Sequence, residues 1–402
     1  MTSSEIVYEL ASSSWDQDEL DAMQRVIKSG NFTMGQEVRE FESKFADYFG
    51  TKFAVMSNSG SSANLLAMAA IKYSKKYGKD QRDEVIVPAV SWSTTYYPIT
   101  QLGYKLRFVD VDLNSLNATA SAIQAAISNR TAGIFAVNLL GNPSDLEAIS
   151  NLASEAGIFL LEDNCESMGA KIGTKFSGTF GQIGTFSSFF SHHISTMEGG
   201  LCVTDDEELA QLMTSLRAHG WTRELPETNH VHDKTGDKFD DLFRFVLPGY
   251  NLRPLELSGA IGIEQLKKLP AINNQRRLNA ELFKSRIVFE DVLIQEEIGD
   301  SSWFGFSLIL EGDLSGRRSE LVSHLTSNGI ESRPIVAGNF TRNPVMQHLD
   351  HVNLEPLPNA DKIHQDGLFV GNSQEDLSKE ILILEIALRE FIEQHKSTNP
   401  SF

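Results

Sequence analysis

Two adjacent histidines, His192 and His193, lie in the stretch SFFSHHISTMEGG, which spans residues 188–200. An imidazole exchanges protons near neutral pH, because its unperturbed pKa is about 6.5. Adjacent side chains of an extended chain point apart, and no metal-ligand spacing accompanies this pair, so the pattern does not favour a metal site. The stretch therefore indicates either an acid–base group before a glycine turn or two ordinary loop histidines.

A stretch of small residues, SNSGSSANLL at 57–66, places Gly60 and Ser61 between an expected strand and an expected helix. Backbone N–H groups at a helix N-terminus, together with nearby hydroxyls, suit an anion such as a phosphate group. Ser187 and Ser188, beside the two histidines, are further candidate ligands for that anion. Taken alone, the small-residue stretch is more typical of a plain serine-rich helix cap.

Two carboxylates and a tryptophan follow other apolar runs. FLLEDNCESMGA, at 159–170, puts Asp163 directly after such a run and Glu166 three residues later. A carboxylate in that place either binds a protonated heteroaromatic nitrogen or caps the next turn. Trp92, in PAVSWSTTYYPI at 88–99, either stacks on a planar ring or packs in the core. None of these signals is specific alone, but their order along the chain is.

The elements that must position these side chains alternate between helix and strand patterns from about residue 35 to 205. Residues 35–50 have helical spacing of apolar residues, whereas EVIVP, KLRFVDVD, TAGIFAVN and IFLLED are short apolar runs. This alternation predicts an α/β fold, with a mostly parallel sheet covered by helices on both faces. In such sheets ligands bind beyond the carboxyl ends of the strands, where the polar residues named above are expected.

The length of 402 residues suits one large domain and a smaller one. Residues 224–247 are charged and turn-rich and predict a long loop. The C-terminal part of the chain predicts a second α+β unit. It contains the apolar run WFGFSLIL and helices expected near 275–288, 318–328 and 378–395. We therefore expect a large domain at 1–268, including the N-terminal segment, and a smaller C-terminal α+β domain at 269–402.

Composition excludes several classes of partner. The formal net charge of −19 argues against nucleic acid, which requires clustered lysine and arginine. The two cysteines, Cys165 and Cys202, are too few for a disulfide framework or a four-thiolate iron–sulfur cluster. No secretion signal and no apolar stretch of about 20 residues is present, so we expect a cytoplasmic protein without a membrane partner.

In their order and spacing these motifs resemble the DegT/DnrJ/EryC1/StrS-type sugar aminotransferases, a family of fold-type I that uses pyridoxal 5'-phosphate (PLP) and acts on nucleotide-linked keto sugars. The resemblance runs from GNFTMGQEVREFESKFADYFG, at 30–50, to the terminal helix. It implies a seven-stranded, mostly parallel sheet in the large domain. In the family, S-F-x-x-x-K followed by G-E-G-G supplies the lysine that binds PLP covalently. This chain has no lysine in that loop.

The position of the missing lysine depends on the direction of counting. Counting forward from the Ser-Phe pair at 188–189 reaches His193, whereas counting backward from Glu-Gly-Gly at 198–200 reaches His192, because this loop is one residue shorter. Three further stretches resemble the sugar 3-dehydratases of the family, in which a histidine replaces the lysine. These stretches are RAHGWTRELP, FVLPGYNLRPLELSGAIGIEQLKKLP and SRPIVAGNF. That resemblance implies His193 as the catalytic base.

These dehydratases remove the C3 hydroxyl of GDP-4-keto-6-deoxy-D-mannose. They use PLP in its amine form, pyridoxamine 5'-phosphate (PMP), which L-glutamate restores, and ammonia is released. By resemblance, His193 removes a proton and protonates the departing hydroxyl. The cofactor-binding residues that the resemblance implies are Gly60, Ser61, Trp92, Asp163, Glu166, Ser188 and Asn251.

Four of the implied residues concern the partner subunit, the substrates or a departure from the family. Glu166 stands where aminotransferase members commonly have glutamine, near the ring hydroxyl of the cofactor. Asn251 resembles a residue that reaches the phosphate from the partner subunit, which implies a homodimer with shared active sites. Arg223 and Arg333 are candidates for binding the substrate anion or the glutamate carboxylate, or are exposed arginines of solvated loops.

Two other functions remain open from the sequence. A nucleotide-sugar aminotransferase would need another lysine, for example Lys171 or Lys175. A catalytically silent sensor or scaffold would keep the fold without the reaction. A related group of CDP-sugar dehydratases also has histidine here but requires an iron–sulfur cluster and a reductase, and two cysteines do not supply such a cluster. We therefore expect no iron–sulfur reductase partner.

Overall fold

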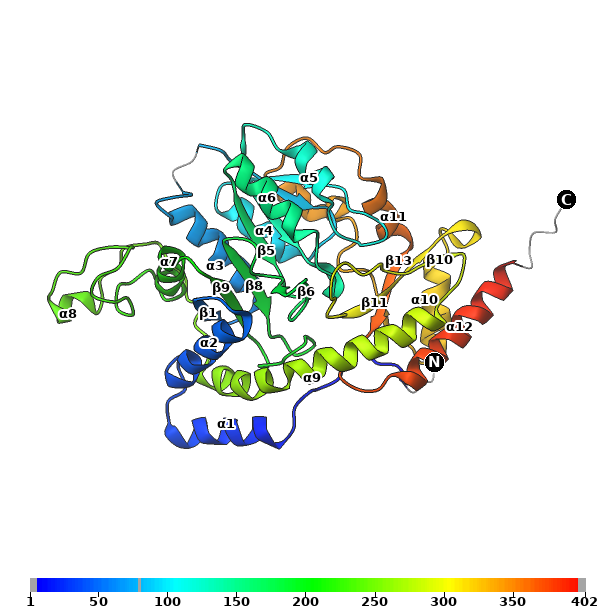
Figure 1. Cartoon of the computed structure of the whole chain (residues 1–402), viewed down its shortest axis with the longest axis horizontal. Helices are drawn as coiled ribbons and strands as arrows, with labels where there is room; N and C mark the ends of the chain where they lie inside the picture. Colours follow the sequence, from blue (N-terminus) through cyan, green and yellow to red (C-terminus); the bar gives the residue numbers. More distant parts are fainter. Residues whose placement is uncertain (1–5, 79–80, 397–402) are drawn as a thin grey trace.

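A seven-stranded sheet forms the centre of the larger part of the molecule (Figure 1). The structure is a computed structural model that describes residues 6–78 and 81–396. The strand order is β1-β9-β8-β5-β4-β2-β3, in which only β9 runs antiparallel to its neighbours. The strands are β1 (Phe53–Ser57), β2 (Glu84–Pro88), β3 (Lys105–Val109), β4 (Thr131–Val137), β5 (Phe159–Asp163), β8 (Ile183–Ser187) and β9 (Gly200–Thr204). The expected α/β fold with a mostly parallel sheet is confirmed.

Helices cover both faces of this sheet, which explains why its strands read as continuous apolar runs rather than alternating ones. One face packs against α3 (Gly60–Tyr73), α4 (Ser93–Gln101) and α7 (Glu207–Arg217). The other face packs against α2 (Gln36–Phe49), α5 (Ala120–Ala126), α6 (Leu146–Ala156) and the first half of α9 (Glu256–Arg286). The carboxyl ends of the parallel strands are left uncovered by these helices.

A four-stranded antiparallel sheet with its own apolar core forms the smaller part, in the order β10-β11-β13-β12. Its strands are β10 (Val292–Leu293), β11 (Gly305–Leu310), β12 (Ser332–Arg333) and β13 (Gly367–Gly371). Its helices are α10 (Arg318–Ser327), α11 (Pro358–Asp366) and α12 (Ser378–Lys396). The predicted strand WFGFSLIL and the predicted helices near 318–328 and 378–395 correspond to β11, α10 and α12.

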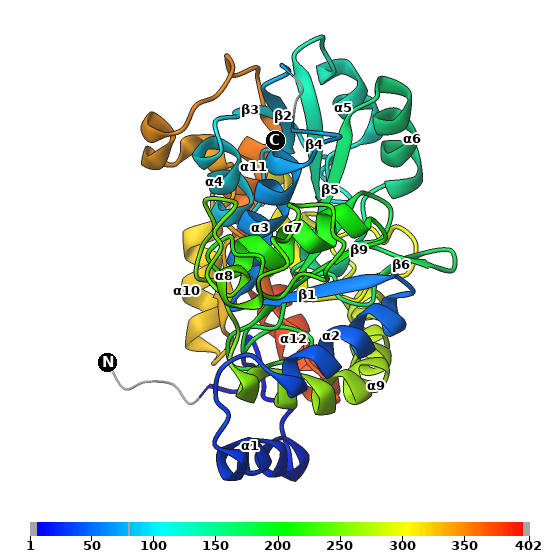
Figure 2. The ribbon, with the colours of Figure 1, turned by 90° about the vertical axis from the view of Figure 1, so that its left-hand side faces the viewer.

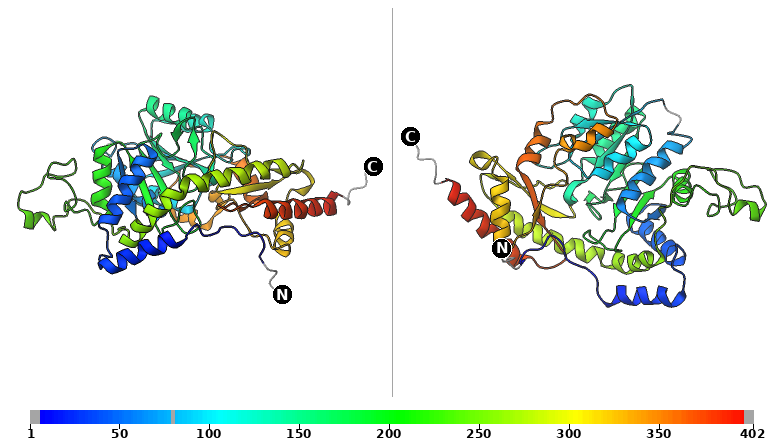
Figure 3. Two further views of the ribbon diagram at one scale, coloured as in Figure 1. Left: turned by 60° about the horizontal axis from the view of Figure 1, so that its bottom comes forward. Right: turned by 180° about the vertical axis from the view of Figure 1, so that it is seen from behind.

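The long helix α9 connects the two parts, with α1 (Gln17–Ser29) and α2 beside its first half and α12 beside its second (Figure 3). The helix expected near 275–288 is thus the second half of a continuous element. The expected boundary between residues 268 and 269 falls inside α9. Apolar packing does not divide at one position, since Tyr8 belongs to the smaller core and Phe340 to the larger one. The boundary stays a prediction.

The stretch predicted as a long loop projects from the body after α7, and we call residues 225–250 the arm (Figures 1 and 2). It contains a single short helix, α8 (Lys238–Asp241). Three phenylalanines of the arm, Phe239, Phe243 and Phe245, are 79%, 62% and 59% exposed. Two further strands, β6 (Lys171–Ile172) and β7 (Lys175–Phe176), form a small hairpin elsewhere. Among the described helices none combines the length and apolarity that a membrane span needs.

The start of α2 is capped from a distance rather than by its own residues. Its N-cap, Gly35, has no side chain to accept the first N–H groups. Instead, the buried carboxylate of Glu256, at the start of α9, accepts the N–H groups of Gly35 at 2.6 Å, Glu37 at 2.7 Å and Val38 at 3.3 Å. This interaction fixes α2 against α9 beneath the sheet.

We expect Glu256→Gln to lower the free energy of unfolding by about 1–3 kcal/mol. The amide would turn an NH2 group toward a backbone donor and remove the negative charge at the helix start. Urea unfolding followed by circular dichroism measures the change. The control is Glu37→Gln, which removes a half-exposed ion pair to Arg25 at 3.2 Å and should cost under about 1 kcal/mol. Equal effects of the two variants would contradict the capping role.

Candidate active site

A cavity of about 470 Å³ opens beyond the carboxyl ends of β4, β5 and β8, between the two parts of the molecule. Segments from both parts form its wall, since Phe304, Arg333 and Phe369 come from the smaller part. The predicted residues in the wall are Gly60, Ser61, Trp92, Asp163, Glu166, His192 and Arg333. The structure therefore brings together most of the side chains that the sequence singled out.

The start of α3 forms one end of the cavity. Gly60 begins the helix, and the side chain of Ser59 caps it by accepting the Ser62 N–H at 3.1 Å. Ser187, at the end of β8, lies directly against Gly60, where an added Cβ would be 2.6 Å from the Cβ of Ser187. Backbone donors at the start of α3 with the hydroxyls of Ser61 and Ser187 form a small cradle that suits a phosphate group.

Ser188 does not line this cradle, and its prediction as a cofactor ligand is corrected. Its buried hydroxyl is hydrogen-bonded to the hydroxyl of Thr196 at 2.7 Å, and it lies outside the cavity wall. The physical reason is the alternation of side chains along an extended chain, which turns neighbouring residues to opposite sides. Ser187 is the serine that faces the cavity.

Asp163 ends β5 and is held in one orientation by three donors. Its Oδ2 accepts hydrogen bonds from Asn64 Nδ2 at 2.8 Å and from Thr95 Oγ1 at 2.7 Å, and its Oδ1 accepts the Cys165 N–H at 3.2 Å. The carboxylate thus links α3, α4 and the sheet at the floor of the cavity. Asn64 and Thr95 were not predicted from the sequence, although Asn64 lies one helical turn after Gly60 and so shares its face.

Glu166 contributes a second carboxyl group with a different character. Burial, reinforced by the nearby charge of Asp163, raises the pKa of Glu166 to about 7, although its Oε2 accepts the Leu140 N–H at 3.0 Å. Leu140 lies in the left-handed region, with φ of 53°, in a short turn after β4. At neutral pH the Glu166 carboxyl therefore both holds and releases a proton readily.

Trp92 precedes α4 and presents its indole to the cavity. The side chain is 57% exposed, so it is not a core residue. The cavity lies between this indole and the end of β5, a space bounded on one side by an aromatic face and on another by Asp163. A planar ring fits such a space better than a flexible chain does.

His192, not His193, contributes its ring to the cavity wall. The Nδ1 atom of His192 is buried and has no hydrogen-bond partner among the described residues. Burial, with a further contribution from the positive charge of Arg276, lowers the pKa of His192 to about 4. The ring is therefore neutral at physiological pH.

The prediction of His193 as the base does not agree with this geometry and is corrected. His193 is 1% exposed, and its Nε2–H donates to the backbone carbonyl of Ser302 at 3.1 Å. Burial lowers its pKa well below the usual value, so it too is neutral. The shortened loop makes the backward count the correct one, because a turn in which His192 N–H donates to Phe189 O brings the first histidine to the cavity.

Two predicted residues lie away from this chain's own cavity. Arg223 lies just before the arm, with its guanidinium 5.1 Å from the ring centroid of Trp221. Asn251 is exposed just after the arm, and its side-chain oxygen accepts a hydrogen bond from Arg253 Nε at 3.1 Å. Neither residue lines the cavity. Their predicted roles stay predictions.

The lysines considered as alternatives also lie elsewhere. Lys171 and Lys175 are on the β6–β7 hairpin, where their ammonium groups lie over the rings of Phe176 and Phe180 at 4.2 and 4.3 Å. Among the described residues that form the cavity wall there is no lysine, and Arg333 is the only cation of the Lys or Arg type.

The sheet has seven strands and is mostly parallel. At its carboxyl edge lie a phosphate cradle at the start of a helix, an aspartate at the end of a strand and an aromatic wall. These features define a transferase-type fold of the PLP-dependent fold-type I class. The chain belongs to the DegT/DnrJ/EryC1/StrS aminotransferase family, whose model matches residues 13–381. The family that the sequence motifs resemble is confirmed.

Two similar proteins are GDP-4-keto-6-deoxy-D-mannose 3-dehydratases. The one from Yersinia pseudotuberculosis is 54% identical over 379 residues, which cover 94% of this chain and 96% of that protein. The one from Escherichia coli O55:H7 is 52% identical over 387 residues, which cover 96% of this chain and all of that protein. A solved structure of the E. coli dehydratase with bound hydrated PLP matches with a TM-score of 0.93 and 52% identity, covering 96% of this chain and 100% of that one.

We expect the His192 ring to remain neutral at all pH values above about 5. NMR of protein labelled at its histidine rings, with His192→Gln for assignment, measures this titration. The unfolded ring takes up its proton near pH 6.5, so the neutral folded ring makes stability fall as the pH drops from about 6.5 toward 4. His192→Gln should weaken that dependence in urea unfolding. A ring that titrates near pH 6.5 would contradict the burial argument.

Proposed function

We propose that this chain is a PLP- and PMP-dependent 3-dehydratase that removes the C3 hydroxyl of GDP-4-keto-6-deoxy-D-mannose, with L-glutamate restoring PMP and ammonia released. The observation that carries the proposal is that the described residues of the cavity wall include a neutral histidine, His192, and no lysine. The dehydratases at 52–54% identity support the substrate. A structure with a trapped PLP-glutamate adduct, at 51% identity and a TM-score of 0.92, supports glutamate as the second substrate.

The residues of the cavity fit the cofactor without a covalent bond. The cradle of Gly60, Ser61 and Ser187 would hold its phosphate group, and the indole of Trp92 would stack on its ring. Asp163, already oriented by three donors, would pair with the protonated ring nitrogen. When bound, the cofactor supplies an amine that combines with the sugar ketone and a ring that accepts electrons.

His192 would move the protons of the reaction. A lysine amine would bind the cofactor covalently and release an amine product, whereas an imidazole forms no such stable bond. The neutral ring of His192 accepts a proton and then has one to give to the departing C3 hydroxyl. The absence of lysine therefore changes amine transfer into loss of a hydroxyl group.

A solved variant of the similar dehydratase supports His192 over His193. Its structure, at 51% identity and a TM-score of 0.91, has lysine in place of a histidine and asparagine in place of the serine directly before it. In the loop of this chain a serine directly precedes only His192, as Ser191, whereas His193 follows another histidine. The position of His192 in the cavity wall supports the same assignment.

Glu166 would be a second group in the same cavity that exchanges protons near neutral pH. With a pKa of about 7, its carboxyl group is able to donate a hydrogen bond to the ring hydroxyl of the cofactor or accept one from it. The glutamine common in aminotransferases donates but never ionises. Glu166 thus suits a cofactor whose charge changes during the reaction.

The active unit would be a homodimer in which each subunit completes the cavity of the other. The cavity wall of one chain contains Asp163, Glu166 and Glu198 against the single cation Arg333, a poor balance for a diphosphate-linked substrate. Asn251 and Arg223 flank the arm, outside their own cavity. The exposed phenylalanines of the arm supply apolar surface for the partner subunit.

We expect the wild-type chain, supplied with PLP and glutamate, to release ammonia from GDP-4-keto-6-deoxy-D-mannose and form the 3-deoxy product. His192→Asn should lower turnover at least about 100-fold, because general acid–base catalysis is lost. His193→Gln, which keeps a donor for the Ser302 carbonyl, should lose under about tenfold. Ammonia release and mass spectrometry of the nucleotide sugar measure both.

Borohydride reduction in the presence of PLP distinguishes the proposed dehydratase from an aminotransferase, and a binding assay distinguishes it from a sensor or scaffold. A covalent adduct on a lysine would favour an aminotransferase over a dehydratase. Binding of the nucleotide sugar by the PMP form without ammonia release would favour a sensor or scaffold. Greater loss in His193→Gln than in His192→Asn would return the base to His193.

Mixing two inactive variants tests the shared site. His192→Asn damages a cavity through its own subunit, and Asn251→Asp would damage the cavity of the partner by repelling the phosphate. Equal mixtures, refolded or exchanged together, should recover about one quarter of the wild-type turnover, since half of the dimers are mixed and each has one intact cavity. No recovery, or a monomer by light scattering at full activity, would contradict the shared site.

A further inference from the structure

The backbone of Ser195, three residues after His192, is held from two sides by side chains distant in the sequence. Its N–H donates to Gln265 Oε1 at 2.9 Å, and its carbonyl accepts the indole N–H of Trp15 at 2.9 Å. Gln265 lies on α9, and Trp15 lies in the segment just before α1. Two separate elements therefore hold Ser195 through both of its backbone polar groups, within residues 188–200, which we call the histidine loop.

The amide of Gln265 has every hydrogen-bonding position occupied. Its Oε1 also accepts the hydroxyl of Ser14 at 2.7 Å, while its Nε2 donates to Glu19 Oε1 at 2.8 Å and to the Ser14 carbonyl at 3.2 Å. The side chain is completely buried. Turning the amide over would oppose donors to donors and acceptors to acceptors, so one orientation is strongly favoured.

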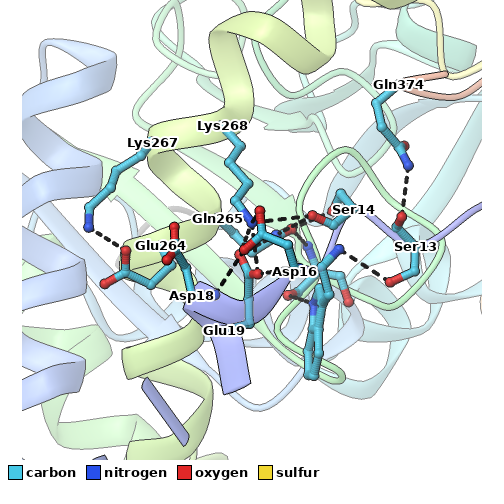
Figure 4. A network of polar contacts seen from close by, with 12 residues as sticks. Ser13, Ser14, Asp16, Asp18, Glu19, Glu264, Gln265, Lys267, Lys268 and Gln374 are labelled. Carbon is cyan, nitrogen blue, oxygen red and sulfur yellow. Dashed lines mark hydrogen bonds and ion pairs between the residues drawn. The ribbon is translucent and has the colours of Figure 1, made fainter. Parts of the chain in front are cut away.

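The N-terminal segment holds this amide in place, as Figure 4 shows. Glu19 is completely buried, and its carboxylate lies 2.7 Å from Lys268 Nζ and accepts the Asp16 N–H at 2.7 Å. Asp16 caps α1, and its own carboxylate is 2.9 Å from Lys268 Nζ. Residues 14–19 and residues 265–268 are thus joined in one network behind the histidine loop.

The ring of His192 depends on that loop for its position. Its buried Nδ1 has no hydrogen-bond partner among the described residues, and its ring touches Phe304 and Phe189 at centroid distances of 5.1 and 5.9 Å. Such aromatic contacts restrain a ring weakly compared with a hydrogen bond. A lysine joined covalently to a cofactor is positioned by that bond, whereas the position of this histidine depends mainly on its backbone.

We propose that Gln265 is a positioning residue for His192: its amide fixes the Ser195 peptide of the histidine loop, and the segment Ser14–Glu19 keeps that amide oriented. The proposal rests on the function of His192 proposed above. Trp15, which belongs to that segment, provides a second hold through the Ser195 carbonyl. The polar network around the start of α1 therefore serves the cavity, although none of its residues lines it.

Gln265→Met keeps the length of the side chain and removes both of its polar groups, and Trp15→Phe removes only the donor to Ser195. We expect both variants to speed hydrogen–deuterium exchange of the peptide covering residues 191–198 in the PLP-bound protein. With GDP-4-keto-6-deoxy-D-mannose and glutamate, kcat should fall about tenfold or more, while KM stays within about twofold and the absorbance spectrum of bound PLP is unchanged.

Gln374→Met is the matched control, because the Gln374 amide binds the same N-terminal segment through the Ser12 hydroxyl and the Ser13 carbonyl, both at 2.9 Å, without touching the histidine loop (Figure 4). It should leave exchange and kcat as in the wild type. Unchanged exchange in Gln265→Met and Trp15→Phe, or an equal fall in kcat in Gln374→Met, would overturn the proposal. Absence of dehydration by the wild type would instead refute the proposed function, and exchange alone would still decide whether Gln265 holds the loop.

Discussion

A base without a covalent bond to its cofactor must be positioned entirely by the protein, and much of this structure follows from that constraint. The histidine loop is anchored to the rest of the molecule through the His193 ring on the Ser302 carbonyl and through the Ser195 backbone between Gln265 and Trp15, and the Ser188 hydroxyl on Thr196 braces it internally. Each anchor uses a buried group, so water does not compete for the hydrogen bond. Because the His193 ring is bound to Ser302, His192 is the histidine of the pair that faces the cavity.

The same constraint applies to the cofactor, which would be held by contacts alone. The sheet makes this feasible, because β5 and β8 end side by side and bring Asp163 and Ser187 to one edge. Asn64 and Thr95 then tie Asp163 to α3 and α4, so the phosphate cradle, the aromatic wall and the ring partner belong to one hydrogen-bonded unit. Displacing any one of these elements would disturb the others.

Much of this arrangement follows from the sequence, and the remainder depends on geometry that no local pattern encodes. Apolar runs, the small residues at Gly60 and the aspartate after β5 have local physical causes, and those predictions of fold and placement agree with the structure. The expected roles of Ser188 and His193 do not agree with the geometry, because each depends on the direction in which one side chain faces, and in this cavity Ser187 and His192 face inward. Gln265 lies about 70 positions from Ser195, and only folding brings the two together.

Burial shifts two titratable groups of the cavity, His192 and Glu166, toward their uncharged forms. Burial beside Arg276 keeps His192 neutral, while burial beside Asp163 brings the pKa of Glu166 close to neutral pH. Both shifts favour the uncharged form of their group, as expected where water is scarce. Asp163 is the group supplied with three donors, and it therefore suits a lasting partner of opposite charge.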